Sequence, residues 1–534
     1  MAVEPVPGRA AAILNRFSSL NEKVPVLVLA VWAWLYLPRP FQLGFYHDDW
    51  WSFVEATNGN APFSLQRLNL FMGAHSSFLS RPVGGFLAFL LGSIGGISSF
   101  RYQACVAVLV LLAALSLRAW FRALMRAFDP PARFWAPEIA TLFWLSAPWS
   151  FAGTAWPSAA ILAVPAQIFF TEALRRVSPP KQLDARRLLI FGALLTASYL
   201  TYESFYFVVL LVIALYLAMD RRIREALWLS GVAVGTQVLV LGINRFMAGV
   251  NPEMAKKIYP AWRTLFLQSL LGLPHQMLLR MGTLGGIWAG LVLALAAAAL
   301  VSMAVGLRTR TQRRATVYAL GILLVGAGAI PVTILTYSVA SYGVSTAGLE
   351  SRTFFPVCWA LTILVYGFVL LLTQLRWNNA GLLLLALPLA IIVLDSTAQR
   401  RQIQDLAHVW NQEREVLAHA PVESIKALPK DSRILFIGPA YLGDLVIFGA
   451  YWDITGAVFS LPPLNQGRQA YQGLTIMDSA TRLYNWSWDG KNLVQELPGY
   501  WKETRPAVHL FVWNYDDGNR FFEAEAGFRW PAAP

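Results

Sequence analysis

Long apolar runs recur through the first 395 of the 534 residues, and most are long enough to cross a bilayer core of about 30 Å as a helix. A helix bonds all its backbone polar groups internally, which a lipid surrounding demands. Charged residues make up 14% of the chain, against about 25% in soluble proteins. These features exclude an ordinary soluble enzyme and predict an all-α polytopic membrane protein for residues 1–395.

The apolar runs predict about eleven membrane-spanning helices. The first run follows Arg9, Arg16 and Lys23 and precedes Arg39 and Pro40, where a signal peptide would need small residues for cleavage, so we interpret it as an uncleaved span. The predicted spans are residues 24–37, 102–121, 134–149, 157–174, 188–202, 204–219, 226–243, 283–306, 316–340, 354–373 and 380–395.

The distribution of basic residues predicts the orientation. If the N-terminus is cytoplasmic, the inner loops hold 20 Lys and Arg, whereas the much longer outer segments hold ten. The positive-inside rule favours this arrangement, and an odd number of spans then places the C-terminal part outside the membrane. Residues 1–395 hold 30 Lys and Arg against 15 Asp and Glu, so the basic excess belongs to the membrane part, and we expect contact with membrane lipids and no nucleic-acid partner.

Two outer segments, residues 38–101 and 244–282, are long and too apolar for free loops. Residues 63–72 and 82–97 have helix-like apolar content but are short or broken by glycine, which favours helices that lie at the outer membrane surface.

After residue 395 the composition becomes polar. A helical stretch at 397–418 precedes strand-like runs at 433–437 and 508–512, which predicts a small extracytoplasmic α/β domain over residues 396–534. Its tryptophans could stack on sugar rings, although a core role is favoured in a domain of this size. They are Trp486, Trp488, Trp501 and Trp513.

The strongest local motif is residues 46–51, which read Tyr-His-Asp-Asp-Trp-Trp shortly after the first span. One carboxylate of Asp48 and Asp49, expected at the surface, could act as a general base, and the other could hold a sugar hydroxyl, a water or a divalent cation such as Mg²⁺ or Mn²⁺. No cofactor is otherwise indicated. The alternative is a helix N-cap, with Trp50 and Trp51 as interface anchors.

Other polar residues fall in the predicted outer segments. Arg81 stands before Pro82, which suits a first helical turn, and its guanidinium could clamp a phosphate or contact a lipid headgroup. For nearby His75, polar packing is favoured over catalysis. Glu203 lies in a short outer hairpin, where a site role and a loop role are equally supported.

Glu350 and Arg352 precede the tenth span, in the run Glu-Ser-Arg-Thr-Phe-Phe-Pro at residues 350–356. They could form a structural ion pair, which would not exclude ligand binding.

Taken in order, these motifs resemble the GT-C superfamily of integral membrane glycosyltransferases, in particular bacterial relatives of protein O-mannosyltransferases. The resemblance covers about residues 10–395. It consists of an acidic pair in the first outer loop, a basic-proline element, a glutamate hairpin and a late Glu-Arg-aromatic-Pro motif. The late motif here lacks the tyrosine that relatives usually carry.

The resemblance implies transfer of a sugar from a polyprenyl-phosphate carrier to an extracytoplasmic glycan, lipid or protein hydroxyl, at the cytoplasmic membrane, by inverting single displacement. Asp48 or Asp49 would be the base. Arg81, Arg352 and either Arg245 or Arg263 would stabilise the leaving phosphate. His75, Glu203 and Glu350 would complete the substrate site.

A lipid-linked sugar flippase or other transporter is the alternative from another class, because many spans with buried charges also suit alternating access. The acids cluster on one predicted face and no internal repeat is visible, which favours the enzyme. An O-antigen-type polymerase or ligase is a further alternative, because it would use the same kind of donor on the same side of the membrane.

Overall fold

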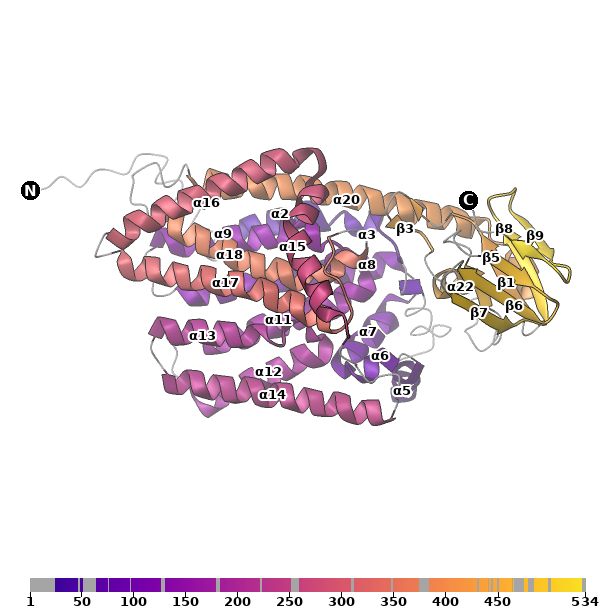
Figure 1. The fold of residues 1–534 in the computed structure, drawn as a ribbon, viewed down its shortest axis with the longest axis horizontal. Coiled ribbons are helices and arrows are strands. Elements are labelled where there is room, and N and C mark those ends of the chain that lie inside the picture. The colour runs from indigo at the N-terminus through magenta and orange to yellow at the C-terminus, as the bar shows by residue number, and fades with distance from the viewer. Residues whose placement is uncertain are drawn as a thin grey trace, which may run out of the picture. The chain divides into compact units, whose positions relative to one another are not determined.

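The fold is seen in a computed structural model of the chain (Figure 1). The structure describes residues 25–46, 49–50, 64–74, 76–96, 98–125, 130–178, 183–220, 223–250, 259–308, 312–346, 349–373, 384–429, 432–439, 441–442, 445–448, 451–462, 464, 475–478, 485–497 and 501–530.

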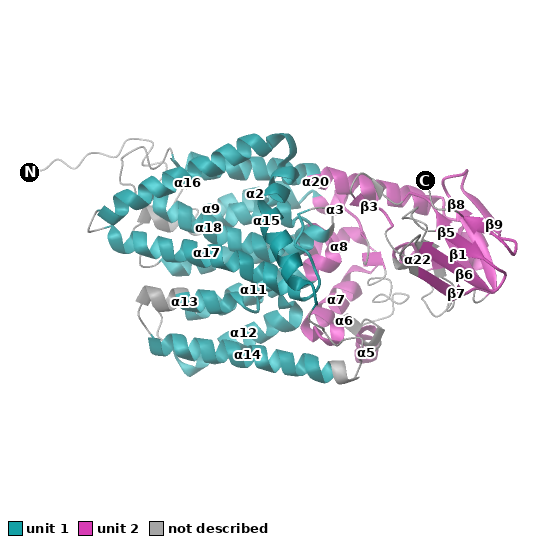
Figure 2. Cartoon of the chain, in the orientation of Figure 1, with its two compact units in different colours: residues 1–38, 107–154, 162–401 teal, residues 39–106, 155–161, 402–534 magenta. Residues whose placement is uncertain are grey.

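Two compact units divide the chain, and both are discontinuous in sequence (Figure 2). Unit 1 comprises residues 1–38, 107–154 and 162–401, and unit 2 comprises residues 39–106, 155–161 and 402–534. The predicted domain boundary at residue 395 stays a prediction.

Unit 1 is helical throughout its described part. Its elements are α2 (Val26–Tyr36), α8 from residue 107 (Ser99–Leu124 in full), α9 (Pro130–Ser146), η3 (Pro148–Ser150), α10 (Ala152–Ala155), α11 from residue 162 (Pro157–Val177 in full), α12 (Ala185–Thr201), η4 (Glu203–Phe205), α13 (Val208–Asp220), α14 (Ile223–Val250), α15 (Trp262–Met281), η6 (Gly282–Leu284), α16 (Gly285–Arg308), α17 (Arg313–Val339), η7 (Leu349–Phe354), α18 (Phe355–Thr373) and α20 to residue 401 (Ala386–Ala418 in full).

Each of the eleven predicted spans coincides with a helix, which confirms the polytopic helical fold. Among the described residues, six helices are long and apolar enough to cross a membrane by length and composition. The other predicted spans fall in shorter helices or, for 380–395, at the start of α20, which continues as one helix into the stretch predicted at 397–418.

Burial in unit 1 distinguishes a core helix from helices with apolar outer faces. Helix α18 is buried along most of its length and packs against α17 and α9, and Trp359 stacks on Trp120 with ring centroids 5.5 Å apart. Leu227 and Trp228 of α14 and Leu300 of α16 are instead exposed. Large exposed apolar side chains are expected where a helix faces lipid tails.

Unit 2 begins with short helices around the predicted outer segment. They are α3 (Arg39–Gln42), α5 (Leu65–Ala74), α6 (Ser76–Leu79), α7 (Pro82–Gly95) and the start of α8. Pro82 is the first residue of α7, as predicted, because that position needs no backbone N–H donor. The helix ends before Gly96, which has a φ of 58°, a conformation that glycine adopts without a steric penalty.

The C-terminal part of unit 2 contains the predicted sheet structure. Strand β1 pairs in parallel with β4 and β8, and β9 pairs antiparallel to β8; a second, antiparallel sheet has the order β10-β5-β6-β7. The elements are α21 (Val422–Lys426), β1 (Ser432–Ile437), β2 (Tyr441–Leu442), β3 (Leu445–Val446), α22 (Tyr451–Phe459), β4 (Thr475–Asp478), β5 (Asn485–Trp488), β6 (Asn492–Leu497), β7 (Trp501–Pro506), β8 (His509–Asn514), β9 (Arg520–Glu523) and β10 (Arg529–Trp530).

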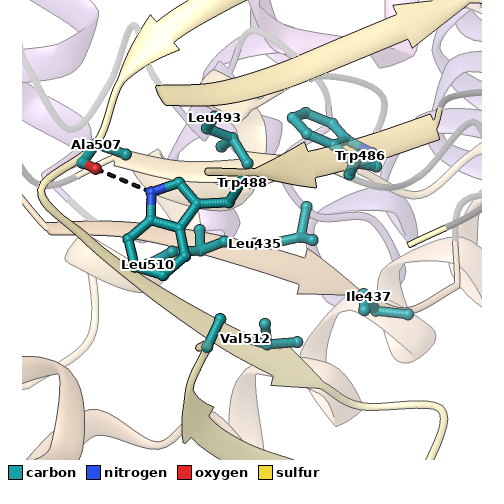
Figure 3. Packing of buried hydrophobic residues seen from close by; sticks show 9 residues of the cluster. Leu435, Ile437, Trp486, Trp488, Leu493, Ala507, Leu510 and Val512 are labelled. Carbon is teal, nitrogen blue, oxygen red and sulfur yellow. Dashed lines mark hydrogen bonds between the residues drawn. The ribbon is translucent and has the colours of Figure 1, made fainter. Parts of the chain in front are cut away.

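The two sheets share a hydrophobic core (Figure 3). Leu435 of β1 and Val512 of β8 pack with Trp486 and Trp488 of β5, and the Trp488 indole donates to the carbonyl of Ala507 at 2.9 Å. Trp513 is buried beside Phe436. These three tryptophans are core residues, whereas the side chain of Trp501 lies outside the described residues.

Candidate functional site

The acidic motif lies at the start of unit 2. We call residues 44–50 the acidic motif loop; the structure describes residues 44–46, 49 and 50 of it. Asp48, the first acid of the predicted pair, and His75 both lie outside the described residues.

Asp49 is held by two backbone amides. Its Oδ2 accepts from the N–H of Tyr46 at 2.9 Å, and its Oδ1 accepts from the N–H of Ser158 at 2.7 Å. Ser158 lies in the first turn of α11, where backbone N–H groups lack partners within the helix and a negative charge is favourable. Asp49 is 0% exposed, so the expected surface position is wrong for this residue. Its contact is a capping interaction, made to α11.

Tyr46 makes three further hydrogen bonds in this region. Its carbonyl accepts from the indole of Trp156 at 2.9 Å, while its phenolic oxygen accepts from the N–H of Gly44 at 3.1 Å and donates to the carbonyl of Leu406 at 3.2 Å. Burial raises the pKa of Tyr46 well above its ordinary value, and the negative charges of Glu413 and Asp49 raise that pKa further. The phenol therefore remains protonated and keeps its donor role.

Gly44 allows close packing at the beginning of the loop. Its carbonyl accepts from Gln103 Nε2 at 2.9 Å, and the same nitrogen donates to the carbonyl of Ala155 at 3.0 Å. A Cβ atom at Gly44 would lie 1.9 Å from the ring of Trp410. Only glycine fits without movement of that indole.

Trp50 connects the loop to residues that the sequence analysis did not single out. Its indole N–H donates to Glu413 Oε2 at 3.1 Å, and its ring stacks on Trp410 with centroids 5.7 Å apart. Phe45 packs edge-on against both indoles. Glu413 is 0% exposed, and no sequence pattern signals this burial, because it depends on contacts with distant residues such as Trp50, which lies 363 positions away in the chain.

Arg81 lies in unit 2 at the N-cap of α7 and is half-buried. Its backbone N–H donates to the carbonyl of Phe78, and its own carbonyl accepts from the N–H of Gly85 in the first turn of α7.

Glu203 lies in unit 1, half-buried in η4 between α12 and α13. Its neighbours form a hydroxyl chain: Ser204 Oγ and the Tyr337 hydroxyl are 2.9 Å apart, and Tyr337 donates to the Tyr202 hydroxyl at 3.2 Å. The hairpin is thus tied to α17.

The late motif forms η7 in unit 1. Ser351 Oγ accepts from the N–H of Ala152 at 3.0 Å, and Thr353 Oγ1 donates to the carbonyl of Glu350 at 2.9 Å. Glu350 and Arg352 form the expected ion pair at 3.5 Å, with side chains 59% and 26% exposed. The turn is anchored by its hydroxyl residues, while Glu350 is exposed and Arg352 is half-buried.

Arg245 of α14 and Arg263 of α15 are both exposed in unit 1. Arg263 lies over the ring of Trp262, with its guanidinium carbon 5.4 Å from the ring centroid. Of the predicted site residues, the structure brings together Glu350 and Arg352.

No group of three or more His, Cys, Asp or Glu that could hold a metal ion occurs among the described residues. Each oxygen of Asp49 accepts one backbone N–H, and the cation site suggested for Asp48 and Asp49 stays a prediction.

The described part of the chain thus has the architecture of a polytopic membrane protein with a C-terminal α/β region. No family model matches the chain. No curated protein matches it either.

Among solved structures, the chain is similar to ArnT from Cupriavidus metallidurans bound to undecaprenyl phosphate, at 14% identity and a TM-score of 0.43, covering 87% of this chain and 91% of that one. It is similar to arabinofuranosyltransferase AftD from Mycobacteria, at 15% identity and a TM-score of 0.43, covering 86% of this chain and 32% of that one.

A third similar structure is the Archaeoglobus fulgidus oligosaccharyltransferase in complex with Zn and sulfate, at 14% identity and a TM-score of 0.41, covering 95% of this chain and 75% of that one. At these identities and TM-scores the likeness carries no argument about the donor, the acceptor or the reaction.

Proposed function

We propose that this chain is an integral membrane glycosyltransferase that moves a sugar from a polyprenyl-phosphate carrier to an extracytoplasmic hydroxyl. The observation that carries the proposal is the anchored acidic motif loop, in which Tyr46 and Asp49 are fixed by backbone and indole hydrogen bonds. A catalytic carboxylate needs such preorganisation, because small displacements of a reacting group cost large factors in rate.

The geometry of Asp49 favours different roles for the two acids of the pair. Asp49 is buried, and both its oxygens accept backbone N–H groups, which suits a residue that holds the loop. We therefore assign the general base to Asp48, its neighbour in sequence.

The reaction is a single displacement. Asp48 removes the proton of the acceptor hydroxyl, the oxygen bonds to the anomeric carbon, and the bond from that carbon to the carrier phosphate breaks on the opposite face. The anomeric centre is inverted, and the carrier leaves as polyprenyl phosphate. No second carboxylate is needed as a nucleophile, in contrast to a retaining glycosidase.

Arginines are the proposed partners of the departing phosphate. Arg81 and Arg352 follow from the motif order, and exposed Arg245 and Arg263 are further candidates. A planar guanidinium binds phosphate in a bidentate manner and stabilises charge that develops in the transition state. His75, Glu203 and Glu350 complete the proposed substrate site.

The orientation is also part of the proposal. A cytoplasmic N-terminus, supported by the basic inner loops, puts the acidic motif and the C-terminal sheets outside the cytoplasmic membrane. The C-terminal region would then influence the choice of acceptor, whether glycan, lipid or protein.

The test is sugar transfer by the purified chain in lipid nanodiscs, with radiolabelled polyprenyl-phosphate sugars as donors and released polyprenyl phosphate as the readout. We expect release by the wild type and by Glu415→Gln, an exposed control. Asp48→Asn should lose at least about 10² of turnover, as expected for a general base. Wild-type turnover in a folded Asp48→Asn protein would reject the assignment.

A further inference from the structure

Helix α20 presents one face to the acidic motif loop. Leu406, Trp410 and Glu413 are spaced i, i+4 and i+7, which places them on the same side of an α-helix. The carbonyl of Leu406 accepts from the Tyr46 hydroxyl, Trp410 stacks on Trp50, and Glu413 accepts from the Trp50 indole. All three positions therefore contact the same short loop.

The contact between Trp50 and Glu413 lies in the interior of unit 2. Trp50 is 4% exposed and Glu413 is 0% exposed, and the indole nitrogen and Oε2 are 3.1 Å apart. A buried indole N–H that loses its acceptor is left unsatisfied, which is costly. This bond therefore restrains the ring of Trp50, next to Asp49 in the chain.

His419, the residue that follows α20, contacts the connection between β8 and β9. Asn519 Nδ2 donates to the carbonyl of His419 at 2.7 Å, and the ring of His419 packs edge-on against Tyr515. Both Asn519 and Tyr515 lie in the connection between β8 and β9. The segment 406–419 thus contacts the motif loop at one end and the β8–β9 connection at the other.

We propose that Glu413 is a positioning residue, which through the indole of Trp50 holds the acidic motif loop against α20. The catalytic meaning of this role rests on the proposed function, with Asp48 as base. Glu413 contributes a hydrogen-bond acceptor to the indole rather than a proton acceptor for the substrate. The role therefore depends on the oxygen that faces Trp50 and not on the charge of the side chain.

The first test is hydrogen exchange of the full chain in nanodiscs, followed at the amides of Tyr46 and Asp49, whose bonds lie within the loop. Glu413→Leu should accelerate this exchange about tenfold, because it removes the acceptor of a buried indole N–H. Glu413→Gln, which keeps an oxygen acceptor, and the exposed control Glu415→Gln should exchange like the wild type.

Unchanged exchange in Glu413→Leu would overturn the proposal, and so would equal acceleration in Glu413→Gln, since that would assign the effect to charge. If Glu413→Leu does not fold, Trp410→Leu replaces it: this variant removes the stacking partner of Trp50 and should also accelerate exchange, and a rate like the wild type counts against the proposal.

The second test is sugar transfer. Turnover by Glu413→Leu should fall about 10²-fold with an unchanged KM for the donor, as expected when a reacting group is misplaced, and Glu413→Gln should restore it. A loss of turnover that Glu413→Gln does not restore would overturn the positioning role. A wild type that transfers no sugar would reject the proposed function, while the exchange measurements would still decide the role of Glu413.

Discussion

The backbone N–H of Ser158 donates to Asp49 Oδ1 at 2.7 Å and joins two residues that are 109 positions apart. This bond ties the start of α11 to the acidic motif loop, and a buried carboxylate at that point complements the partial positive charge of the helix N-terminus. Asp49 therefore belongs to the framework that fixes the loop.

Asp49→Asn should destabilise the protein. The amide keeps one oxygen but turns an NH₂ group toward a backbone N–H, so one of the two bonds is lost and a donor is left facing a donor. We expect a loss of about 2 to 3 kcal/mol, typical of a buried hydrogen bond to a charged group. The thermal unfolding of the purified full chain measures this loss.

The matched control is Glu415→Gln, which neutralises an exposed acid on α20 and should leave the unfolding temperature unchanged. An Asp49→Asn protein as stable as this control would show that the two backbone bonds contribute little.

How much the sequence predicted can be judged from residues of the same region. The position of Pro82 at the start of α7 follows from local chemistry, and it was predicted. The buried state of Asp49 depends on Ser158 and Trp156, which approach only after the helices have packed. Periodicity and motif order carry no information about such distant contacts.

Gly44→Ala should also destabilise the protein, by about 1 to 3 kcal/mol, as overpacked sites do. The added methyl group would meet ring atoms of Trp410 at 1.9 to 2.5 Å, a separation that forces the indole or the loop to move. The same measurement of thermal unfolding applies.

A second mutation identifies the cause. In a Trp410→Leu background the same Gly44→Ala change should cost much less, because the clashing ring is gone. Gly231→Ala is the control, since a Cβ there meets nothing within 4 Å. An equal penalty in both backgrounds would assign the effect to the backbone of Gly44 instead.

The turn between β5 and β6 should depend on pH. Asp489 Oδ1 accepts from the N–H groups of Asn492 at 2.7 Å and Lys491 at 2.8 Å, and these bonds lower the pKa of its carboxyl group below the ordinary value. A lowered pKa means that the stabilisation is present above the ordinary pKa and is lost as pH falls through the folded-state pKa.

We therefore expect Asp489→Ala to reduce the exchange protection of the Lys491 and Asn492 amides at pH 7, after correction for intrinsic rates. The difference from the wild type should shrink below about pH 3.9, the reference value for an aspartate. A difference that does not shrink as the pH falls below this value would contradict the role of the ionised carboxylate.

The strands and the late motif also show which features could be predicted from the sequence and which could not. Strands β1 and β8 lie where the apolar runs at 433–437 and 508–512 predicted them, because their residues favour an extended chain. An ion pair of Glu350 and Arg352 was one role that the sequence left open, and the structure contains this pair. The exposure of Glu350 could not be predicted, because it depends on the bonds that Ser351 and Thr353 make in η7.

Arg352→Lys should lower sugar transfer strongly while leaving stability almost unchanged. The ion pair with Glu350 is long, at 3.5 Å, and the Glu350 side chain is 59% exposed; ion pairs open to solvent contribute at most about 1 kcal/mol to folding. If the guanidinium binds the leaving phosphate, an ammonium cannot replace its bidentate contact. We expect turnover to fall by about 10² to 10³, as for the loss of one preorganised anion-stabilising donor.

The double variant Glu350→Gln with Arg352→Gln separates this role from a structural one. Removing both charges leaves no unpaired partner, so a purely structural pair predicts recovery of both stability and transfer relative to Arg352→Gln alone. Phosphate binding predicts that stability stays near the wild type and that transfer stays low, because the donor to the phosphate is absent in both variants. Recovery of transfer in the double variant would therefore exclude Arg352 from the phosphate site and leave η7 with a structural ion pair.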